Sequence, residues 1–389
     1  MTKKMLNGKT VAVLLACAIL QQPAPLRATG NAEALEKIAA SSKSGRAVEY
    51  LDRLVNGIGA RHAGTAADYA ACEWALAQFE NIGLRNVHAE LCAFQPSFAP
   101  SDTGETRNKP VRNVVADIIG VELPDEYVII GAHLDSTGPG RGAEDNGSGV
   151  AAVMEAARLI MKSGAKPRRT IRFILFAGEE AMLLGSRSYV MDHGDILPKI
   201  SAMFNMDEGG RNPVSGIKVA ASMKGPFSAL EGRIASMKPG FDFTLHLVDS
   251  LSQGARVECG GTGTGKSGSS PAQPEEASNP GGPAVESPSP IQAQPGGMTL
   301  EIRKCFGTSD HAAFLEAGIP AFMFLQKGPE PYHGHSGNDN FDVVIPEVLQ
   351  HAAAAMAVTA LTVSDMDCMV DRRNVGTISG EFEGCGIGK

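Results

Sequence analysis

Acidic and histidine side chains gather in one glycine-rich stretch of the chain, GAHLDSTGPGRGAEDNGSG at residues 131–149. It contains His133, Asp135 and Asp145, and the apolar run YVII at residues 127–130 leads into it. Imidazole and carboxylate groups are common metal ligands and common proton-transfer groups. A strand followed by a solvated turn also explains the glycines and most of the polarity, so this stretch alone does not decide between the two.

Two further acidic segments follow apolar runs in the same way. Glu179 and Glu180 come after FILFAG, and Asp207 comes after ISAMFNM. Paired carboxylates often face water at a helix N-terminus, where the helix dipole favours negative charge. At the end of a run that is normally buried, however, adjacent carboxylates repel one another unless a cation lies between them. A bound divalent metal resolves that repulsion.

A pair of histidines completes the set in PYHGHSGND at residues 331–339. His333 and His335 on their own are compatible with a surface loop. Combined with the carboxylates above and with His133, they give the mixture of oxygen and imidazole ligands that is typical of zinc in a hydrolase.

These residues must be positioned by regular elements, and strand patterns alternate with helix patterns along the chain. Strands separated by helices predict an α/β fold, with a mostly parallel central sheet that carries helices on both faces. We find no internal repeat. The predicted strands cover residues 112–119, 127–133, 170–177, 200–206, 217–221 and 319–325, and the predicted helices cover residues 149–162, 181–190, 226–236, 310–317 and 346–362.

The predicted sheet makes a testable statement about the acidic residues. In open α/β sheets, ligands bind beyond the carboxyl ends of the strands. His133 and Asp135 end one predicted strand, Glu179 and Glu180 follow the next, and Asp207 follows a third. We therefore expect these side chains to meet at one edge of the sheet.

The order and spacing of these motifs carry a resemblance to a known family. GAHLDS, AEDNGSG, FAGEE, NMDEGG, SDHAAFLEAGIPA and YHGHSGND resemble the co-catalytic zinc exopeptidase family of aminopeptidase Y, bacterial leucyl aminopeptidase and glutamate carboxypeptidase. The resemblance covers residues 48–364 apart from an insertion. NMDEGG and YHGHSGND look closest to the carboxypeptidase Q branch. The resemblance to this family implies the α/β/α sandwich fold of the zinc peptidases.

The resemblance also implies a metal site with two zinc ions. One ion would be held by His133 and Asp207, the other by Glu180 and His335, and Asp145 would bridge them. Asp145 and its partners come from five separate segments of the chain. The implied site therefore forms only when the chain folds and brings these segments together.

Three further roles follow from the same resemblance. Asp135 would orient His133, although an aspartate so close in sequence can bind the backbone instead. Glu179 would be the general base that takes a proton from the attacking water and passes it to the leaving amine. The implied substrate is a short peptide, most simply cleaved at its N-terminus. A dipeptidase or carboxypeptidase activity, or an inactive binding protein of the same fold, remain as alternatives.

His335 matches the family pattern better than His333. The last histidine of the family is followed by Ser or Thr and then by Asp, as His335 is by serine and by Asp339. His333 would then line the pocket. Asp310 and His311 match the SDH segment near the family's substrate region, and a helix-start role for Asp310 is equally open.

Composition narrows the class of protein. The 389 residues are 43% hydrophobic and 20% charged, which fits one large folded domain. The net charge is −8, from 35 basic and 43 acidic side chains, and this argues against nucleic acid as a partner. No stretch has the length of a transmembrane helix. The sequence indicates no oligomeric state.

The N-terminus has the layout of a secretory signal, with lysines ahead of an apolar run. We expect residues 1–28 to be a signal peptide and the protein to be exported, to the periplasm or beyond. Two cleavage patterns compete: LAC, which would place a lipid anchor on Cys17, and LRA, which ends at Ala28.

The rest of the chain divides into a domain, an insertion and a tail. We expect a zinc exopeptidase domain at residues 29–364, a disordered, proline- and glycine-rich insertion at 260–297, and a tail at 365–389. In an exported chain, an even number of cysteines favours disulfides over buried thiols. We expect neighbouring cysteines to pair, with Cys259 bonded to Cys305. Apart from Cys17, the cysteines are at positions 72, 92, 259, 305, 368 and 385.

Overall fold

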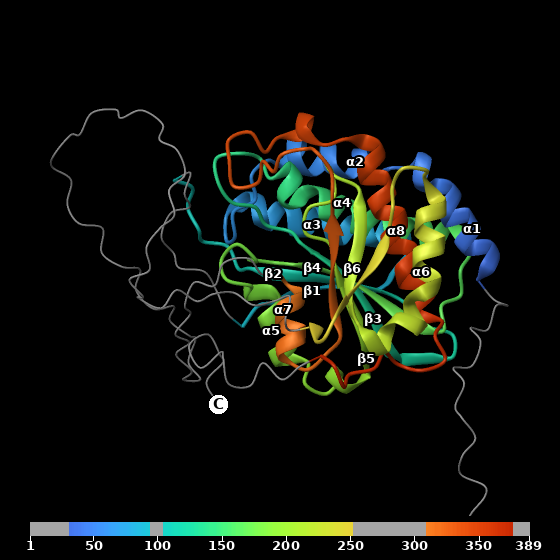
Figure 1. Ribbon diagram of the computed structural model, residues 1–389. Helices are drawn as coiled ribbons and strands as arrows, with labels where there is room; N and C mark the ends of the chain where they lie inside the picture. The colour runs from blue at the N-terminus through green and yellow to red at the C-terminus, as the bar shows by residue number, and fades with distance from the viewer. Residues whose placement is uncertain (1–30, 94–103, 252–308, 376–389) are drawn as a thin grey trace, which may run out of the picture.

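A computed structural model of the chain describes residues 31–93, 104–251 and 309–375. The predicted signal peptide, the predicted insertion and the expected Cys259–Cys305 disulfide lie outside these residues. The described part is built around a single sheet with helices on both sides of its strands (Figure 1).

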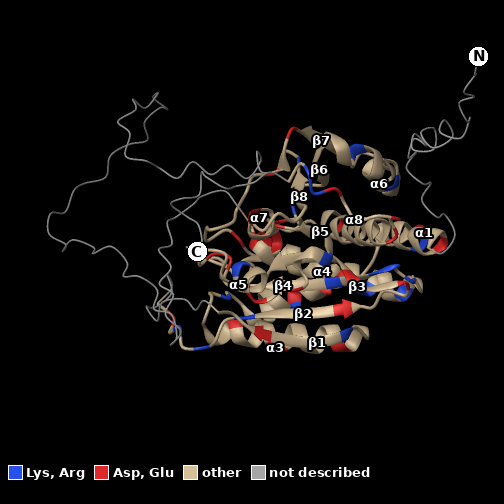
Figure 2. Cartoon of the chain, turned by 90° about the horizontal axis from the view of Figure 1, so that it is seen from below, with Lys and Arg blue, Asp and Glu red and all other residues tan. Residues whose placement is uncertain are grey.

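The sheet has eight strands in the order β1-β2-β4-β3-β5-β8-β6-β7, which can be followed from one edge to the other in Figure 2. Parallel pairing joins β4, β3, β5 and β8 in the centre, and also β6 with β7 at one edge. The strands are β1 (Arg85–Leu91), β2 (Arg112–Ile118), β3 (Leu123–His133), β4 (Arg169–Phe176), β5 (Ile200–Asn205), β6 (Val214–Ala220), β7 (Thr244–Val248) and β8 (Ala321–Gln326).

Antiparallel pairing occurs between β1 and β2, between β2 and β4, and between β6 and β8. The predicted α/β class with a mostly parallel sheet is confirmed: four of the seven strand pairs in the described residues are parallel, and the three antiparallel pairs make the sheet mixed. Its central strands are apolar and buried on both faces, as in β5, where every residue is buried. The strands that the pattern missed, β1 and β7, lie at the two edges.

Helices α4 and α8 pack against each other and against the central strands, whereas α5 and α7 form a second pair that contacts β4, β5 and β8. Each predicted helix is present, with α5 beginning later than predicted because the segment before it forms turns. The helices are α1 (Ala32–Ala40), α2 (Ala47–Asp52), α3 (Ala66–Ile82), α4 (Gly149–Ser163), α5 (Leu184–Asp192), α6 (Lys224–Met237), α7 (His311–Glu316) and α8 (Pro346–Ser364).

Aromatic packing fixes β8 against β5, which matters because β5 leads into the acidic segment at Asp207. The ring of Phe204 on β5 stacks on that of Phe322 on β8, with centroids 5.0 Å apart. Phe227 of α6 meets Phe322 edge to face at 5.3 Å. Such pairs add about 0.5–1.5 kcal/mol each to the free energy gained from burial.

The chain remains packed beyond the predicted end of the domain at residue 364. Met366, Val370 and Val375 are buried, and the guanidinium of Arg169 donates to the carbonyl of Met366. Arg372 donates to the carbonyl of Leu197 at 2.9 Å. The first part of the predicted tail therefore belongs to the core, and residues 376–389 lie outside the described residues.

The described cysteines do not pair as neighbours. Cys72 and Cys92 are both buried and keep separate thiols, so the expected neighbour pairing is wrong for them. Cys368 is exposed.

Within the described ranges, no helix combines the length and the apolar composition that crossing a membrane requires.

Candidate metal centre

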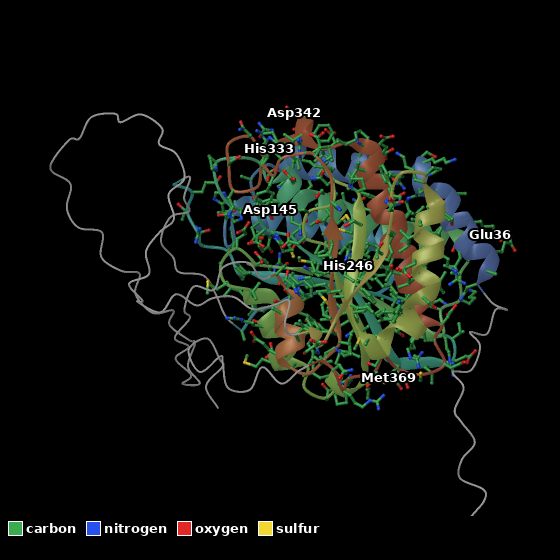
Figure 3. All side chains as sticks on the ribbon, in the orientation of Figure 1. Glu36, Asp145, His246, His333, Asp342 and Met369 are labelled. Carbon is green, nitrogen blue, oxygen red and sulfur yellow. The ribbon has the colours of Figure 1, made fainter. Side chains whose placement is uncertain are left out.

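The predicted site residues meet at the carboxyl ends of β3, β4 and β5, as the strand rule requires. His133 is the last residue of β3, Glu179 and Glu180 lie in the turn after β4, and Asp207 lies just after β5. Asp145 lies in the short turn η3 (Ala143–Ser148) ahead of α4. In Figure 3, Asp145 lies below His333 and Asp342, and Met369 lies at the opposite end of the molecule from those two residues.

The first group of ligand atoms surrounds the imidazole of His133, which is 1% exposed. Its Nε2 lies 3.0 Å from Oδ1 of Asp145 and 3.2 Å from Oδ1 of Asp207. One ligand atom from each of these three residues lies within 4.8 Å of the others, so a single cation can contact all three.

The second group shares Asp145 with the first. Nε2 of His335 lies 3.1 Å from Oδ2 of Asp145 and 3.1 Å from Oε1 of Glu180. These three residues also bring their ligand atoms within 4.8 Å of one another. Asp145 thus directs one oxygen to each group, which is the geometry that a bridging carboxylate needs.

Glu179 adjoins both groups. It forms a third close set with His133 and Glu180. Burial raises the pKa of the Glu179 carboxyl well above its usual range, with the charges of Asp207 and Asp310 adding to the effect and that of His133 opposing it. A carboxylate with a raised pKa accepts a proton readily near neutral pH, which suits a general base.

Asp135 serves the backbone and the histidine at once. Its two carboxylate oxygens accept the N–H groups of Glu179 at 3.0 Å and Glu180 at 3.2 Å. Its Oδ1 also lies 3.4 Å from Nδ1 of His133. This one fully buried side chain therefore ties the end of β3 to the turn that carries the two glutamates.

The electrostatics of the cluster call for positive charge at its centre. Hydrogen bonds with Asp145 and Glu180 raise the pKa of His335 to about 10. Burial disfavours the charged form of His133, yet Asp207, Asp135 and Asp145 raise its pKa well above normal. Oε1 of Glu180 is buried, and Nε2 of His335 lies 3.1 Å from it. Such a set of imidazole and carboxylate groups fits divalent zinc.

Arg61 holds the glycine-rich loop between His133 and Asp145, a role that sequence analysis did not predict. Its side chain is fully buried and donates to the carbonyls of Leu134 at 2.9 Å, Arg141 at 2.8 Å and Gly142 at 2.7 Å. An arginine that binds only backbone carbonyls has no characteristic spacing in a sequence. Its contacts fix the path from His133 to η3.

Glycine is required where the glycine-rich loop contacts the segment that carries His335. Gly138 has φ of +72°, and a Cβ on Gly140 would lie 2.4 Å from the carbonyl oxygen of Ser336. Side chains at these positions would force the loop away from the segment that carries His335.

Tyr332 is a second residue that pattern analysis missed. Its hydroxyl donates to Oδ2 of Asp145 at 2.6 Å. Glu144 accepts the backbone N–H of the neighbouring His333 at 2.8 Å. The close groups of ligand atoms described above include His335 and do not include His333.

Asp310 and His311 lie in the interior beside this cluster. Burial raises the pKa of Asp310 to about 7 and lowers that of His311 to about 4. Asp310 precedes α7 but gives that helix no side-chain cap, so the predicted helix-start contact is not formed.

Comparison with known proteins gives the same picture. A 27% identical alignment with mouse carboxypeptidase Q spans 67% of this chain and 43% of that protein. The structure of a peptidase M28 precursor from Shewanella amazonensis covers 88% of this chain and 98% of its own, with a TM-score of 0.61 and 18% identity. The zinc aminopeptidase BSAP from Bacillus subtilis covers 81% of this chain and 93% of its own, with a TM-score of 0.54 and 18% identity.

The model of peptidase family M28 matches residues 113–235 and 262–360. These ranges make up more than half of the chain and contain all five of the predicted ligands. The chain belongs to peptidase family M28. The sequence alignments with carboxypeptidase Q from Xenopus and mouse span 22% and 43% of those relatives, which is less than half of their length.

Proposed function

We propose that this protein is a zinc-dependent exopeptidase that hydrolyses short peptides, most simply an aminopeptidase that releases N-terminal residues. The observation that carries the proposal is the shared carboxylate: Asp145 lies between a group with His133 and Asp207 and a group with Glu180 and His335. Two zinc ions per chain would occupy the two groups. Family M28 membership and the fold shared with a zinc aminopeptidase support this.

The chemistry divides between the ions and the chain. Zinc bound by these groups supplies a Lewis acid that polarises the scissile carbonyl and lowers the pKa of the attacking water. Glu179 takes the proton from that water and passes it to the amine that leaves. The single O–H of Tyr332 donates to Oδ2 of Asp145; if that oxygen binds zinc instead, the O–H can turn to the substrate and stabilise negative charge on the carbonyl oxygen. Asp135 keeps His133 and the glutamate turn in place.

A dipeptidase or carboxypeptidase activity is the second candidate, because the sequence is similar to carboxypeptidase Q. A screen separates the candidates: purified protein is offered peptides with a free amine, peptides with a blocked N-terminus and simple dipeptides, each with and without a chelator. Cleavage that needs the free amine and stops with chelator supports the aminopeptidase. Cleavage of N-blocked peptides from the carboxyl end would replace it with the second candidate.

Substitution of Glu179 tests the mechanism. Glu179→Gln keeps the side-chain volume but cannot accept the proton, so we expect hydrolysis to fall by about 10²–10⁴-fold while elemental analysis still finds zinc. Glu80→Gln, at an exposed position on α3, is the matched control and should be fully active. Full turnover by Glu179→Gln would remove Glu179 from the role of base. A wild-type protein that stays active after its zinc is removed would overturn the whole proposal. A wild-type protein that binds peptides but hydrolyses none of them would overturn it as well.

The same proposal extends to organisation and location. We propose that residues 29–364, with the packed residues that follow as far as 375, form the catalytic domain. We also propose that residues 1–28 direct export and that the mature chain acts outside the cytoplasm, with a lipid on Cys17 as an anchored alternative. Mass spectrometry of the mature protein distinguishes cleavage after Ala28 from a lipid-modified Cys17.

A further inference from the structure

We propose that Asp339 and Glu144 are positioning residues that lock the turn carrying Asp145 to the loop carrying His335, and so control metal affinity in one half of the site. This inference rests on the proposed function. Neither side chain is among the proposed ligands, and each binds the backbone of the segment that carries a ligand. We call this pair of contacts the clasp.

The first half of the clasp is made by Asp339, which is 1% exposed. Its Oδ1 accepts the backbone N–H of Ala143 at 2.8 Å and that of Glu144 at 2.6 Å, and its Oδ2 accepts that of Asp145 at 3.2 Å. The carbonyl of Asp339 also accepts the N–H of Arg141 at 2.8 Å. One carboxylate thus holds three consecutive N–H groups that end at the bridging aspartate.

In the second half of the clasp, a side chain of the turn binds the backbone of the loop. Glu144 is 2% exposed, and its Oε2 accepts the backbone N–H of His333 at 2.8 Å. The same oxygen lies 3.6 Å from Nδ1 of His333 and 4.0 Å from Nε of Arg211. A side chain of the turn therefore holds the loop, while a side chain of the loop holds the turn.

The clasp matters for one half of the site because the two halves are supported differently. His133 ends β3 and Asp207 follows β5, and these neighbouring strands are paired directly. His335 lies in a loop without regular structure, has φ of +60°, and its side chain is 57% exposed. Its geometry relative to Asp145 depends on what joins the loop to the turn, and charge-assisted bonds to backbone N–H groups are strong joints.

This difference predicts a selective loss. Asp339→Asn replaces one acceptor oxygen of the carboxylate by an NH₂ group. That donor then faces a backbone N–H group, and the hydrogen bond between them is lost. Glu144→Gln weakens the bond to His333 without changing volume. In each variant we expect zinc affinity to fall about 10–100-fold in the group of Asp145, Glu180 and His335. The group of His133, Asp145 and Asp207 should lose less affinity, because two of its three ligands are placed by the directly paired strands β3 and β5.

The test is a zinc titration of the metal-free protein against a competing chromophoric chelator, with thermal melting of the metal-free and zinc-loaded forms. The wild-type protein should bind two ions, and each variant should bind one tightly and one weakly, with less gain in Tm on zinc addition. Asp365→Asn is the matched control: its carboxylate accepts the N–H of Arg168 at 3.1 Å, at the start of β4 and away from the site. It should lower the melting temperature of the metal-free form and leave both affinities unchanged.

Each outcome decides something. Two wild-type affinities in both Asp339→Asn and Glu144→Gln overturn the clasp and leave the proposed function standing. An equal fall of both affinities, or a fall in the metal-free Tm with an unchanged gain on zinc addition, shows a general structural role and also overturns it. If Asp339→Asn fails to fold, Glu144→Gln alone carries the test. A wild-type protein that binds no zinc overturns the proposed function itself.

Discussion

Tyr332 shows how much of this site depends on a single hydroxyl group. It donates to Oδ2 of Asp145, and burial together with that carboxylate raises the pKa of the phenol well above its usual range. In this arrangement the only O–H of Tyr332 is held by Asp145. If zinc takes that carboxylate oxygen, the same O–H becomes free to donate to the carbonyl oxygen on which charge develops.

Removing that donor should slow catalysis more than binding. We expect Tyr332→Phe to reduce kcat by about 10²-fold or more, with a small change in KM and unchanged zinc content. Tyr69→Phe is the control, since the Tyr69 ring packs under the guanidinium of Arg112 at 4.0 Å and does not contact the cluster. Steady-state kinetics check the prediction, and an unchanged kcat in Tyr332→Phe would contradict it.

The hydrogen bonds of Glu90 predict how the free energy of unfolding depends on pH. Burial alone would raise the pKa of Glu90, but hydrogen bonds with His193 and His88 outweigh it and lower the value to about 2. Stability from this carboxylate is complete above its unfolded pKa of 4.5 and is lost as the pH falls through about 2. The hydrogen bond with Glu90 is the main cause that raises the pKa of His88. The stability that His88 contributes is therefore complete below its unfolded pKa of 6.5 and is lost as the pH rises through the raised pKa.

Both contributions are therefore present together between about pH 4.5 and 6.5. In that window we expect Glu90→Gln to lower the free energy of unfolding by about 1 kcal/mol, the upper range for ion pairs near a surface. The cost should shrink as the pH rises through the raised pKa of His88, because that imidazole then loses its charge. Urea unfolding of wild type and variant at pH 5.5 and pH 9 measures the difference, and a cost that does not change with pH would contradict the assignment.

At the residue level, the sequence predicted the groups whose types are chemically distinctive. His133, Glu180 and Asp207 end or follow apolar runs, and that pattern points to the edge of a sheet. The choice of His335 over His333 came from the family resemblance, because spacing alone treats the two equally. Residues that act through the backbone, such as Arg61, left no pattern, since almost any position in a folded chain offers a carbonyl or an N–H group.

At the level of elements, a buried ion pair joins β2 to β4. Asp117 and Arg172 face each other across the two strands, with Nε to Oδ1 at 2.8 Å and Nη2 to Oδ2 at 2.9 Å. Arg172 also lies over the ring of Tyr127 at 4.5 Å. The strand that β2 pairs with is the one that delivers Glu179 and Glu180, so this pair supports the frame of the site.

Breaking the pair should be costly. Asp117→Ala leaves the guanidinium of Arg172 buried without its partner, and we expect a loss of about 3–5 kcal/mol in the free energy of unfolding. The double variant Asp117→Ala with Arg172→Met should recover part of that loss, because no uncompensated charge remains. Urea unfolding of the single and double variants supplies the numbers. A single variant as stable as the wild type would show that the pair contributes little.

The elements near the site were predictable for a physical reason. β3, β4 and β5 are long apolar runs bounded by glycine and acidic residues, and α4 has clear helical spacing. The helix α3 went unpredicted because alanines fill its sequence, so its buried and exposed faces differ little in polarity. The direction of β6 relative to β8 was also out of reach, since pairing of strands far apart in sequence depends on packing rather than on either strand's composition.

At the level of the whole molecule, the site should couple metal binding to folding. Its ligands come from segments that meet only in the native structure, so zinc binds the folded state far better than the unfolded chain. We expect chelation to lower the free energy of unfolding by about 4 kcal/mol for each site held at about 1,000 times its Kd. Repulsion among the buried carboxylates of the metal-free protein is one part of that loss. Thermal melting with chelator and after zinc is restored measures the effect, and superimposable curves would contradict it.

The position of β8 has a consequence for the integrity of the chain. This late strand is inserted between β5 and β6, and α8, which follows it, is buried along almost its whole length. Cutting the backbone once between residues 252 and 308 would separate the chain into two covalent pieces, one with β1 to β7 and the other with β8 and α8. The pieces would still be joined by strand pairing on both sides of β8. Such a nicked protein should stay assembled as a heterodimer of fragments, with His335 on one piece and the other four ligands on its companion.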